Sequence, residues 1–166
     1  EDSDGQSIVL SALDKQTWQL KATDNFTKVH YQVFAFDLSV RTAYLDNQRG
    51  FFNGSSTFLE VKELASKTCS LFIEPPKEHN NWRVATGLPR GKNTEKYQFG
   101  HYVATDYQHL IDCPVAIGDF DSTEFVVEGV THHLVFTSRH FGDTQRLSDD
   151  VAKLCQHHIN LFGEVP

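Results

Sequence analysis

The first two-thirds of the chain alternate short apolar runs with polar turns, which is the pattern of β-strands. From Val29 to Phe36 the apolar and polar residues exchange with a period of two near the start of the run. That period predicts a long strand with one face drier than the other. Further strands are expected in the short apolar runs at residues 7–13, 17–22, 57–61, 69–73, 82–86 and 97–103.

The last third begins with strand-like runs and one short helical turn. Residues 106–111 can form that turn, with Asp106 as its N-cap and Pro114 ending it. Runs at residues 115–120, 124–128 and 132–138, the last two separated by a turn at Gly129, predict the strands of a β-meander.

A long amphipathic helix is predicted at residues 144–162. Asp143 is its candidate N-cap, and Gly163 stands where a helix C-terminus favours glycine. Its apolar face would carry Leu147, Val151, Leu154, Cys155, His158, Leu161 and Phe162. The chain is therefore predicted to be mainly β (α+β), with an antiparallel β-sandwich-like domain, a β-meander and one C-terminal amphipathic helix.

Composition sets limits on the class of protein. A chain of 166 residues corresponds to one domain, or to one domain and the start of another. Its formal charge is -7 and its Lys and Arg are scattered, so nucleic acid is not expected as a partner. No apolar run approaches the roughly 20 residues of a membrane helix, so no membrane segment is predicted.

The beginning of the chain carries no recognisable targeting signal. The stretch "EDSDGQSIVL" has neither the basic nor the apolar region of a secretory signal peptide. The chain has no Met at all, so we expect a processed product or a piece of a longer polypeptide. Asn-x-Ser/Thr triplets at Asn25 and Asn53 carry little weight, because such triplets also arise by chance.

Cysteine and histidine are the residues of this chain most able to bind a metal or act as nucleophiles. The three Cys residues, Cys69, Cys113 and Cys155, form no Cys-x-x-Cys pair, and buried unreactive thiols are expected, with one disulfide left open. None of the nine His residues is followed by Glu, so the His-Glu-x-x-His motif of zinc peptidases is absent. Cys155 and His158 could share a metal ion on the last helix, although a core thiol beside a boundary imidazole is the favoured interpretation.

The residues alone supply no complete catalytic set. His132 and His133 are neighbours on a predicted strand, so they point to opposite faces and cannot hold one ion. The chain has no Gly-x-Ser-x-Gly nucleophile motif, and "GLPRGK" lacks the strand–loop–helix context of a phosphate loop.

One excursion combines unusual charge with aromatic surface. A run fit to be buried, residues 31–40, leads into the charged stretch that begins at Arg41 and ends at the aromatic pair Phe51 and Phe52. The pattern favours a solvated hairpin whose two Phe residues cover the edge of the core. The functional alternative is that Arg41, Tyr44 and Asp46 face a partner or a cleft, since polar loops rimmed by aromatics are common recognition surfaces.

Four long segments point to a family. In order, they are "VFAFDLSVRTAYLDNQRGFFNGSSTFL", "IEPPKEHNNWRVATGLPR", "DYQHLIDCPVAIGDF" and "FVVEGVTHHLVFTSRH". They resemble successive segments of the glycyl aminopeptidase family, bacterial zinc metallopeptidases related to aminopeptidase N that usually carry a PDZ domain. The resemblance runs from about Leu13 to the end of the chain. It implies that residues 1–112 are the later part of an N-terminal β domain and residues 113–166 the first strands and helix of a truncated thermolysin-like catalytic domain.

The resemblance implies an activity for the parent protein. Its zinc would polarise the scissile carbonyl and activate water during release of N-terminal residues from peptides. No zinc ligand or catalytic base can be placed on this chain, so we expect no cofactor in it and no activity from it alone. The implied partners are the catalytic and PDZ domains of the same polypeptide and the parent's peptide substrate, in the bacterial cytoplasm or periplasm.

Under this resemblance, the charged excursion would pack against the catalytic domain or line the cleft entrance. The aromatics would make the interdomain contact and the charges would form the polar rim. The candidate residues are Arg41, Tyr44, Asp46, Arg49, Phe51 and Phe52. An alternative from another class is an independent β-sandwich module that binds peptide or glycan through the same loop. A small metal-dependent hydrolase that uses the His residues is the weakest of the three hypotheses.

Overall fold

The structure, a computed structural model, describes residues 1–21 and 26–165. The chain divides into two compact units, Glu1–Val33 and Phe34–Pro166. In the described ranges the secondary structure is mostly β, arranged as four antiparallel sheets, and a long helix lies at the C-terminal end. The mainly-β class and the C-terminal helix are therefore confirmed, whereas the sandwich arrangement stays a prediction.

The first unit contains a short antiparallel hairpin. It consists of β1 (Leu10–Ala12) and β2 (Trp18–Leu20), with Leu10 opposite Leu20. These strands confirm two of the expected runs, at shorter lengths. The end of the second run and Asn25 lie outside the described residues.

The long strand predicted from Val29 to Phe36 is wrong. Residues 26–35 form no strand, and Phe36 makes only an isolated bridge to Tyr44. The run that was expected to be buried, residues 31–40, is instead largely exposed, and Phe34 reaches 91%. The alternation of apolar residues indicates which face of a strand would be dry, but a strand also needs a neighbour for its backbone N–H and C=O groups.

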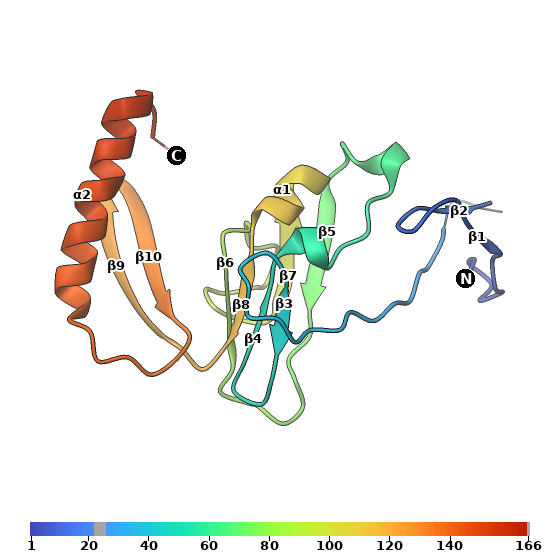
Figure 1. Ribbon diagram of the computed structural model, residues 1–166, viewed down its shortest axis with the longest axis horizontal. Helices are drawn as coiled ribbons and strands as arrows, with labels where there is room; N and C mark the ends of the chain where they lie inside the picture. The colour runs from blue at the N-terminus through green and yellow to red at the C-terminus, as the bar shows by residue number, and fades with distance from the viewer. Residues whose placement is uncertain (22–25, 166) are drawn as a thin grey trace. The chain divides into compact units, whose positions relative to one another are not determined.

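A four-stranded sheet is the centre of the second unit (Figure 1). Its order is β3 (Ala43–Leu45), β4 (Arg49–Phe52), β8 (Val115–Gly118) and β6 (Arg83–Thr86), and every neighbouring pair is antiparallel. β8 lies between β4 and β6, far from them in sequence. The expected meander is thus reduced to the two strands that follow β8.

A second sheet pairs β5 (Cys69–Ile73) with β7 (Gly100–Ala104). The prediction for residues 69–73 is confirmed in full, and the run at residues 82–86 becomes β6 with a start one residue later. β7 begins three residues after the predicted start, because Tyr97 has a φ of 66°, which a regular strand does not allow.

The core of this unit joins the two sheets. Val84 and Val115 are its fully buried side chains, and Phe52 and Phe58 pack against its edge with ring centroids 5.7 Å apart. The buried cluster comprises Ile73, Val84, Leu88, Tyr102, Ala104, Leu110 and Val115.

The strand predicted at residues 57–61 is also wrong. That stretch runs between two short 3₁₀ turns, η1 (Gly54–Ser56) and η2 (Lys62–Leu64). Asn53 caps the first turn, because its Oδ1 accepts a hydrogen bond from the Ser55 backbone N–H at 3.0 Å. The Asn-x-Ser pattern at Asn53 therefore has a local structural role.

The helix α1 (Tyr107–Asp112) confirms the predicted helical turn. Asp106 is its N-cap and accepts a hydrogen bond from the His109 backbone N–H at 2.8 Å. The turn places Leu110 in the core.

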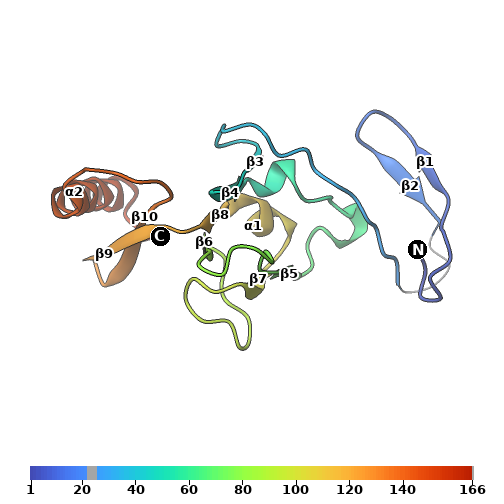
Figure 2. The ribbon, with the colours of Figure 1, turned by 90° about the horizontal axis from the view of Figure 1, so that it is seen from below.

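The C-terminal part consists of a hairpin and the long helix. β9 (Asp121–Val127) and β10 (Val130–Phe136) are joined at Glu128 and Gly129, whose φ values of 49° and 81° suit the tight two-residue turns of hairpins. Helix α2 (Thr144–Phe162) packs against β9, as both Figure 1 and Figure 2 show. The predicted cap at Asp143 and the left-handed residue Gly163 are both confirmed.

The predicted apolar face of α2 is only partly buried. Leu147, Leu154 and Leu161 are exposed, as is Phe162. The buried Ser148 and most of the half-buried positions are instead small or polar; the half-buried ones include Val151, Ala152, Cys155, Gln156 and Ile159. Small side chains allow the helix backbone to approach the hairpin closely, which apolar periodicity does not reveal. Among the described residues, no helix is both long and apolar enough to span a bilayer.

Candidate functional site

The predicted site lies on the β3–β4 hairpin, but the structure does not bring all of its residues together. Tyr44, Asp46 and Arg49 meet at the turn between the two strands. Arg41 stands apart on the exposed stretch before β3, where its backbone N–H donates to Ser39 Oγ at 3.2 Å.

Asp46 builds the turn. Its Oδ1 accepts hydrogen bonds from the backbone N–H groups of Gln48 at 2.8 Å and Arg49 at 2.9 Å, and its Oδ2 accepts one from the Tyr44 hydroxyl at 2.9 Å. An Asp at the first position of a turn commonly bonds the backbone two residues later. The backbone N–H groups of Gln48 and Arg49 hold the pKa of Asp46 below its ordinary value.

The Tyr44 ring connects the turn to aromatic neighbours. The hydrogen bond to the Asp46 carboxylate raises the pKa of the Tyr44 hydroxyl above its ordinary value. The Arg49 guanidinium carbon lies 5.7 Å from the centre of the Tyr44 ring, and the Phe36 ring stacks on it at 5.7 Å. The turn is therefore held by one carboxylate and one aromatic ring.

The two adjacent Phe residues point to opposite faces of the sheet. Phe52 is paired with the buried Ala43 and belongs to the core face. Phe51 is paired with Tyr44 on the other face, where both are half-buried. The expectation that both Phe residues cover the edge of the core thus holds for Phe52 alone.

Beside the turn lies an open depression of about 450 Å³ that sequence analysis did not find. It is lined by residues 47–49 and 137–139, together with His79, Asn81, Trp82 and Asp119. These residues come from four separate parts of the chain. The "HNNW" stretch that contributes three of them has no periodicity, so its closeness to the hairpin turn carried no signal in the sequence.

Two contacts join residues that line the depression. The His79 and Trp82 rings stack with centroids 4.2 Å apart and planes inclined by 14°. Asn81 Nδ2 donates to Asp119 Oδ2 at 2.9 Å, so the carboxylate in the depression already has an amide partner.

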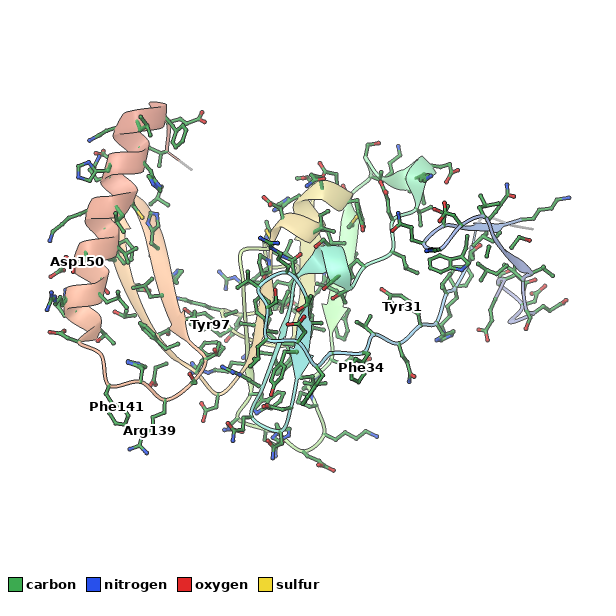
Figure 3. The ribbon with its side chains drawn as sticks, in the orientation of Figure 1. Tyr31, Phe34, Tyr97, Arg139, Phe141 and Asp150 are labelled. Carbon is green, nitrogen blue, oxygen red and sulfur yellow. The ribbon has the colours of Figure 1, made fainter. Side chains whose placement is uncertain are left out.

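A strained aromatic residue links the central sheet to the β9–β10 hairpin. Tyr97 has a positive φ of 66°, and its ring meets Phe120 at 5.2 Å and His133 at 6.3 Å (Figure 3). Next to it, Lys96 Nζ and His133 Nδ1 lie 3.0 Å and 3.4 Å from Glu124 Oε2, and the Lys96 hydrogen bond lowers the pKa of Glu124. These contacts connect β10 to the central sheet, which carries the turn between β3 and β4. Residues 137–139 follow directly after β10.

Arg83 completes this junction. Its guanidinium lies 4.2 Å from the Phe120 ring centre and donates a hydrogen bond to the Phe120 carbonyl. An arginine that is stacked and hydrogen-bonded in this way has a structural role.

The described residues contain no group of three or more His, Cys, Asp or Glu side chains that could hold a metal ion. His132 stacks on Phe125 at 5.1 Å while His133 faces Glu124, which fits their predicted opposite directions. His158 meets the Phe162 ring at 6.3 Å.

The three Cys residues are free thiols and half-buried. Burial raises the pKa of the Cys69 and Cys113 thiols, which disfavours the nucleophilic thiolate. The expectation of unreactive thiols is consistent with these two environments.

Comparisons with known proteins agree with the resemblance seen in the sequence. The family model of the Peptidase M61 N-terminal domain matches residues 1–119. A solved structure of an aminopeptidase N family protein from Idiomarina loihiensis superposes with a TM-score of 0.88 and 42% sequence identity, over 99% of this chain and 28% of that protein. No curated protein matches the chain.

This chain therefore spans less than a third of the length of that solved relative. The two matches confirm the resemblance to glycyl aminopeptidase-like metallopeptidases. By the match over its first 119 residues, the chain belongs to the Peptidase M61 N-terminal domain family.

Proposed function

We propose that the chain is the non-catalytic, β-rich N-terminal part of a zinc-dependent aminopeptidase that releases N-terminal residues from peptides. The observation that carries this proposal is the family match over residues 1–119. The proposed division places residues 1–112 in the β domain and residues 113–166 at the start of a thermolysin-like catalytic domain. The family match ends seven residues beyond that boundary, which supports a change of domain in this region.

The proposed zinc belongs to the remainder of the polypeptide. The residues described here gather no ligand set for it, so no step of the reaction is assigned to them. When bound, zinc would supply Lewis-acid activation of the carbonyl and of water. The partners of this chain are the catalytic and PDZ domains of the same polypeptide and the peptide substrate.

The proposed contribution of this chain is one wall of the active-site cleft. The Tyr44–Asp46–Arg49 turn supports this role because its geometry is fixed by hydrogen bonds within the chain. Phe51 presents a half-buried ring on the same hairpin, away from the core. A rigid polar turn with an aromatic flank can position a substrate without loop rearrangement.

The first experiment tests the activity of the parent. The full-length protein should release N-terminal residues from peptides, lose this activity with a chelator, and recover it with added zinc. The 166-residue chain should show no such activity. Comparable turnover by the purified chain, free of contaminating enzyme, would contradict the proposal.

The second experiment tests whether this chain forms one wall of the active-site cleft. Asp46→Ala and Arg41→Ala are made in the full-length enzyme, with Lys62→Ala in the 3₁₀ turn η2 as a control outside the hairpin. We expect Asp46→Ala to raise KM or lower kcat, because the turn loses the three hydrogen bonds that the Asp46 carboxylate accepts. If turnover, KM and Tm of the Asp46 and Arg41 variants equal those of the control, the stretch from Arg41 to Phe52 is only solvated surface.

A further inference from the structure

Arg49 is a cation beside the Asp46 carboxylate, whose oxygens accept hydrogen bonds from groups other than the Arg49 side chain. Both oxygens of Asp46 accept hydrogen bonds, one from the Tyr44 hydroxyl and the other from two backbone N–H groups. No carboxylate oxygen of a described residue lies within 4.0 Å of the Arg49 side-chain nitrogens. The guanidinium instead lies over the Tyr44 ring, which leaves its N–H groups available.

The rest of the depression is rich in hydrogen-bond donors. Asn47 and Gln48 bring exposed amides, and Thr137 and Ser138 bring hydroxyls. The acidic residue in the lining, Asp119, is bonded to Asn81. The site therefore combines several neutral donors with the Arg49 cation, which the Asp46 carboxylate attracts electrostatically but which forms no salt bridge with a described carboxylate.

Arg139 adds charge at the margin. Its guanidinium carbon lies 5.2 Å from the centre of the exposed Phe141 ring, in the loop after β10 (Figure 3). It raises the positive potential of this edge, while Arg49 is the cation next to the hairpin turn.

The shape of the depression suits the end of a peptide. A volume of about 450 Å³ falls within the roughly 300–1,000 Å³ typical of small-ligand sites. The stacked His79 and Trp82 rings provide one flat wall, and the site is open on its other side.

We propose that this depression binds a peptide carboxylate through Arg49, aided by the amides of Asn47 and Gln48. The planar guanidinium can form two parallel N–H···O bonds with a carboxylate, which a lysine cannot do. The peptide nature of the ligand rests on the proposed function. The carboxylate belongs either to the peptide C-terminus or to an Asp or Glu side chain, and these sources share the chemistry that Arg49 recognises.

Direct binding to the 166-residue chain tests the proposal by isothermal titration calorimetry at low ionic strength. The first probe pair is N-acetyl-glycylglycine and its C-terminal amide. The second pair is N-acetyl-aspartic acid α-amide and N-acetyl-asparagine amide. We expect at least one acid to bind about fivefold or more tightly than its matched amide, the value of a well-formed but open ion pair. The pair that shows the preference identifies the source of the carboxylate.

Arg49→Gln and Arg41→Gln form a matched pair of variants on the same excursion. Arg49→Gln should abolish the preference for the acid, and Arg41→Gln should keep it. Arg49→Lys keeps the charge and loses the planar fork, so it should retain only part of the preference. Near-UV circular dichroism confirms that each variant is folded.

Equal binding of acid and amide, or absence of binding at millimolar probe, would overturn the proposal, as would equal losses in both glutamine variants. These outcomes are separable from failure of the proposed function. Carboxylate binding by a chain whose parent lacks peptidase activity would keep the site and remove the aminopeptidase assignment. If the parent is an active peptidase but the chain shows no carboxylate binding, the aminopeptidase assignment stands and the proposed site is wrong.

Discussion

At the scale of single residues, Asp46 shows how one side chain can determine a candidate site. It ties the β3–β4 turn to Tyr44, and Arg49 beside it forms no salt bridge with a described carboxylate. The sequence placed charge at this tip, but it did not show which charges neutralise each other. The structure makes Asp46 a structural residue and leaves Arg49 as the available cation.

The pKa of Asp46 leads to a prediction on acid stability. Because its pKa is lowered in the folded state, the carboxylate stabilises the fold above the ordinary pKa of 3.8. That contribution is lost as the pH falls through the lower folded value. In Asp46→Asn this part of the pH dependence should be missing from thermal unfolding curves measured between about pH 2 and 7.

The control for this experiment is Glu60→Gln, which removes an exposed carboxylate outside the hairpin. Its unfolding curves should keep the wild-type loss of stability at acid pH. If Asp46→Asn and Glu60→Gln behave alike, the Asp46 hydrogen bonds do not contribute measurably to the stability of the fold.

The core supplies a second prediction at this scale. Val84 is 1% exposed and lies in the central cluster, so Val84→Ala should lower the free energy of unfolding by about 2 kcal/mol through lost burial and a residual cavity. The same truncation at Val40, which is 74% exposed, should change it by less than about 0.5 kcal/mol. Urea unfolding of both variants checks the difference, and similar losses at the two positions would contradict the assigned core.

At the scale of elements, local signals predicted what local interactions determine. The caps at Asp106 and Asp143 and the glycine at Gly163 marked helix ends correctly, because a cap bonds residues two or three positions away. Pro75 and Pro76 follow the end of β5 at Ile73, and neither has a backbone N–H that could continue the ladder.

Non-local pairing accounts for the failures. The runs at residues 29–36 and 57–61 have strand-like composition, but in the structure the first forms only the isolated bridge from Phe36 to Tyr44, and the second pairs with no strand. β8 joined β4 and β6 instead of its sequence neighbours. The depression escaped sequence analysis for the same reason, since His79 and Asp119 meet the hairpin turn only after the sheet has formed.

The α1 cap gives a prediction for an element. Asp106→Ala should lower the free energy of unfolding by about 1 kcal/mol, because the His109 N–H loses its partner. Asp112→Ala, at the other end of the same helix, is the matched control. A negative charge is unfavourable near a helix C-terminus, so this change should be neutral or slightly stabilising in urea unfolding. Equal destabilisation by both changes would show that the cap is not the cause.

At the scale of the whole molecule, exposed apolar side chains occur in several stretches of the described residues. Two of these are the stretch that contains Tyr31, Phe34 and Phe36, and the outer face of α2 with Leu154 and Leu161. Large exposed apolar patches are uncommon on soluble monomers and usually mark contact surfaces. Since the solved relative is more than three times as long, we expect other parts of the parent polypeptide to cover these surfaces.

Hydrogen–deuterium exchange, compared between the 166-residue chain and its full-length parent, tests this expectation. In the chain alone, the amides of residues 29–33 should exchange rapidly, because the structure forms no strand there. In the parent these amides should be protected if a strand from another part of the polypeptide pairs with this stretch. β5 is the internal control and should be protected in both proteins, because it is already paired with β7. Rapid exchange of residues 29–33 in both proteins would show that their apolar alternation does not encode a strand in either context.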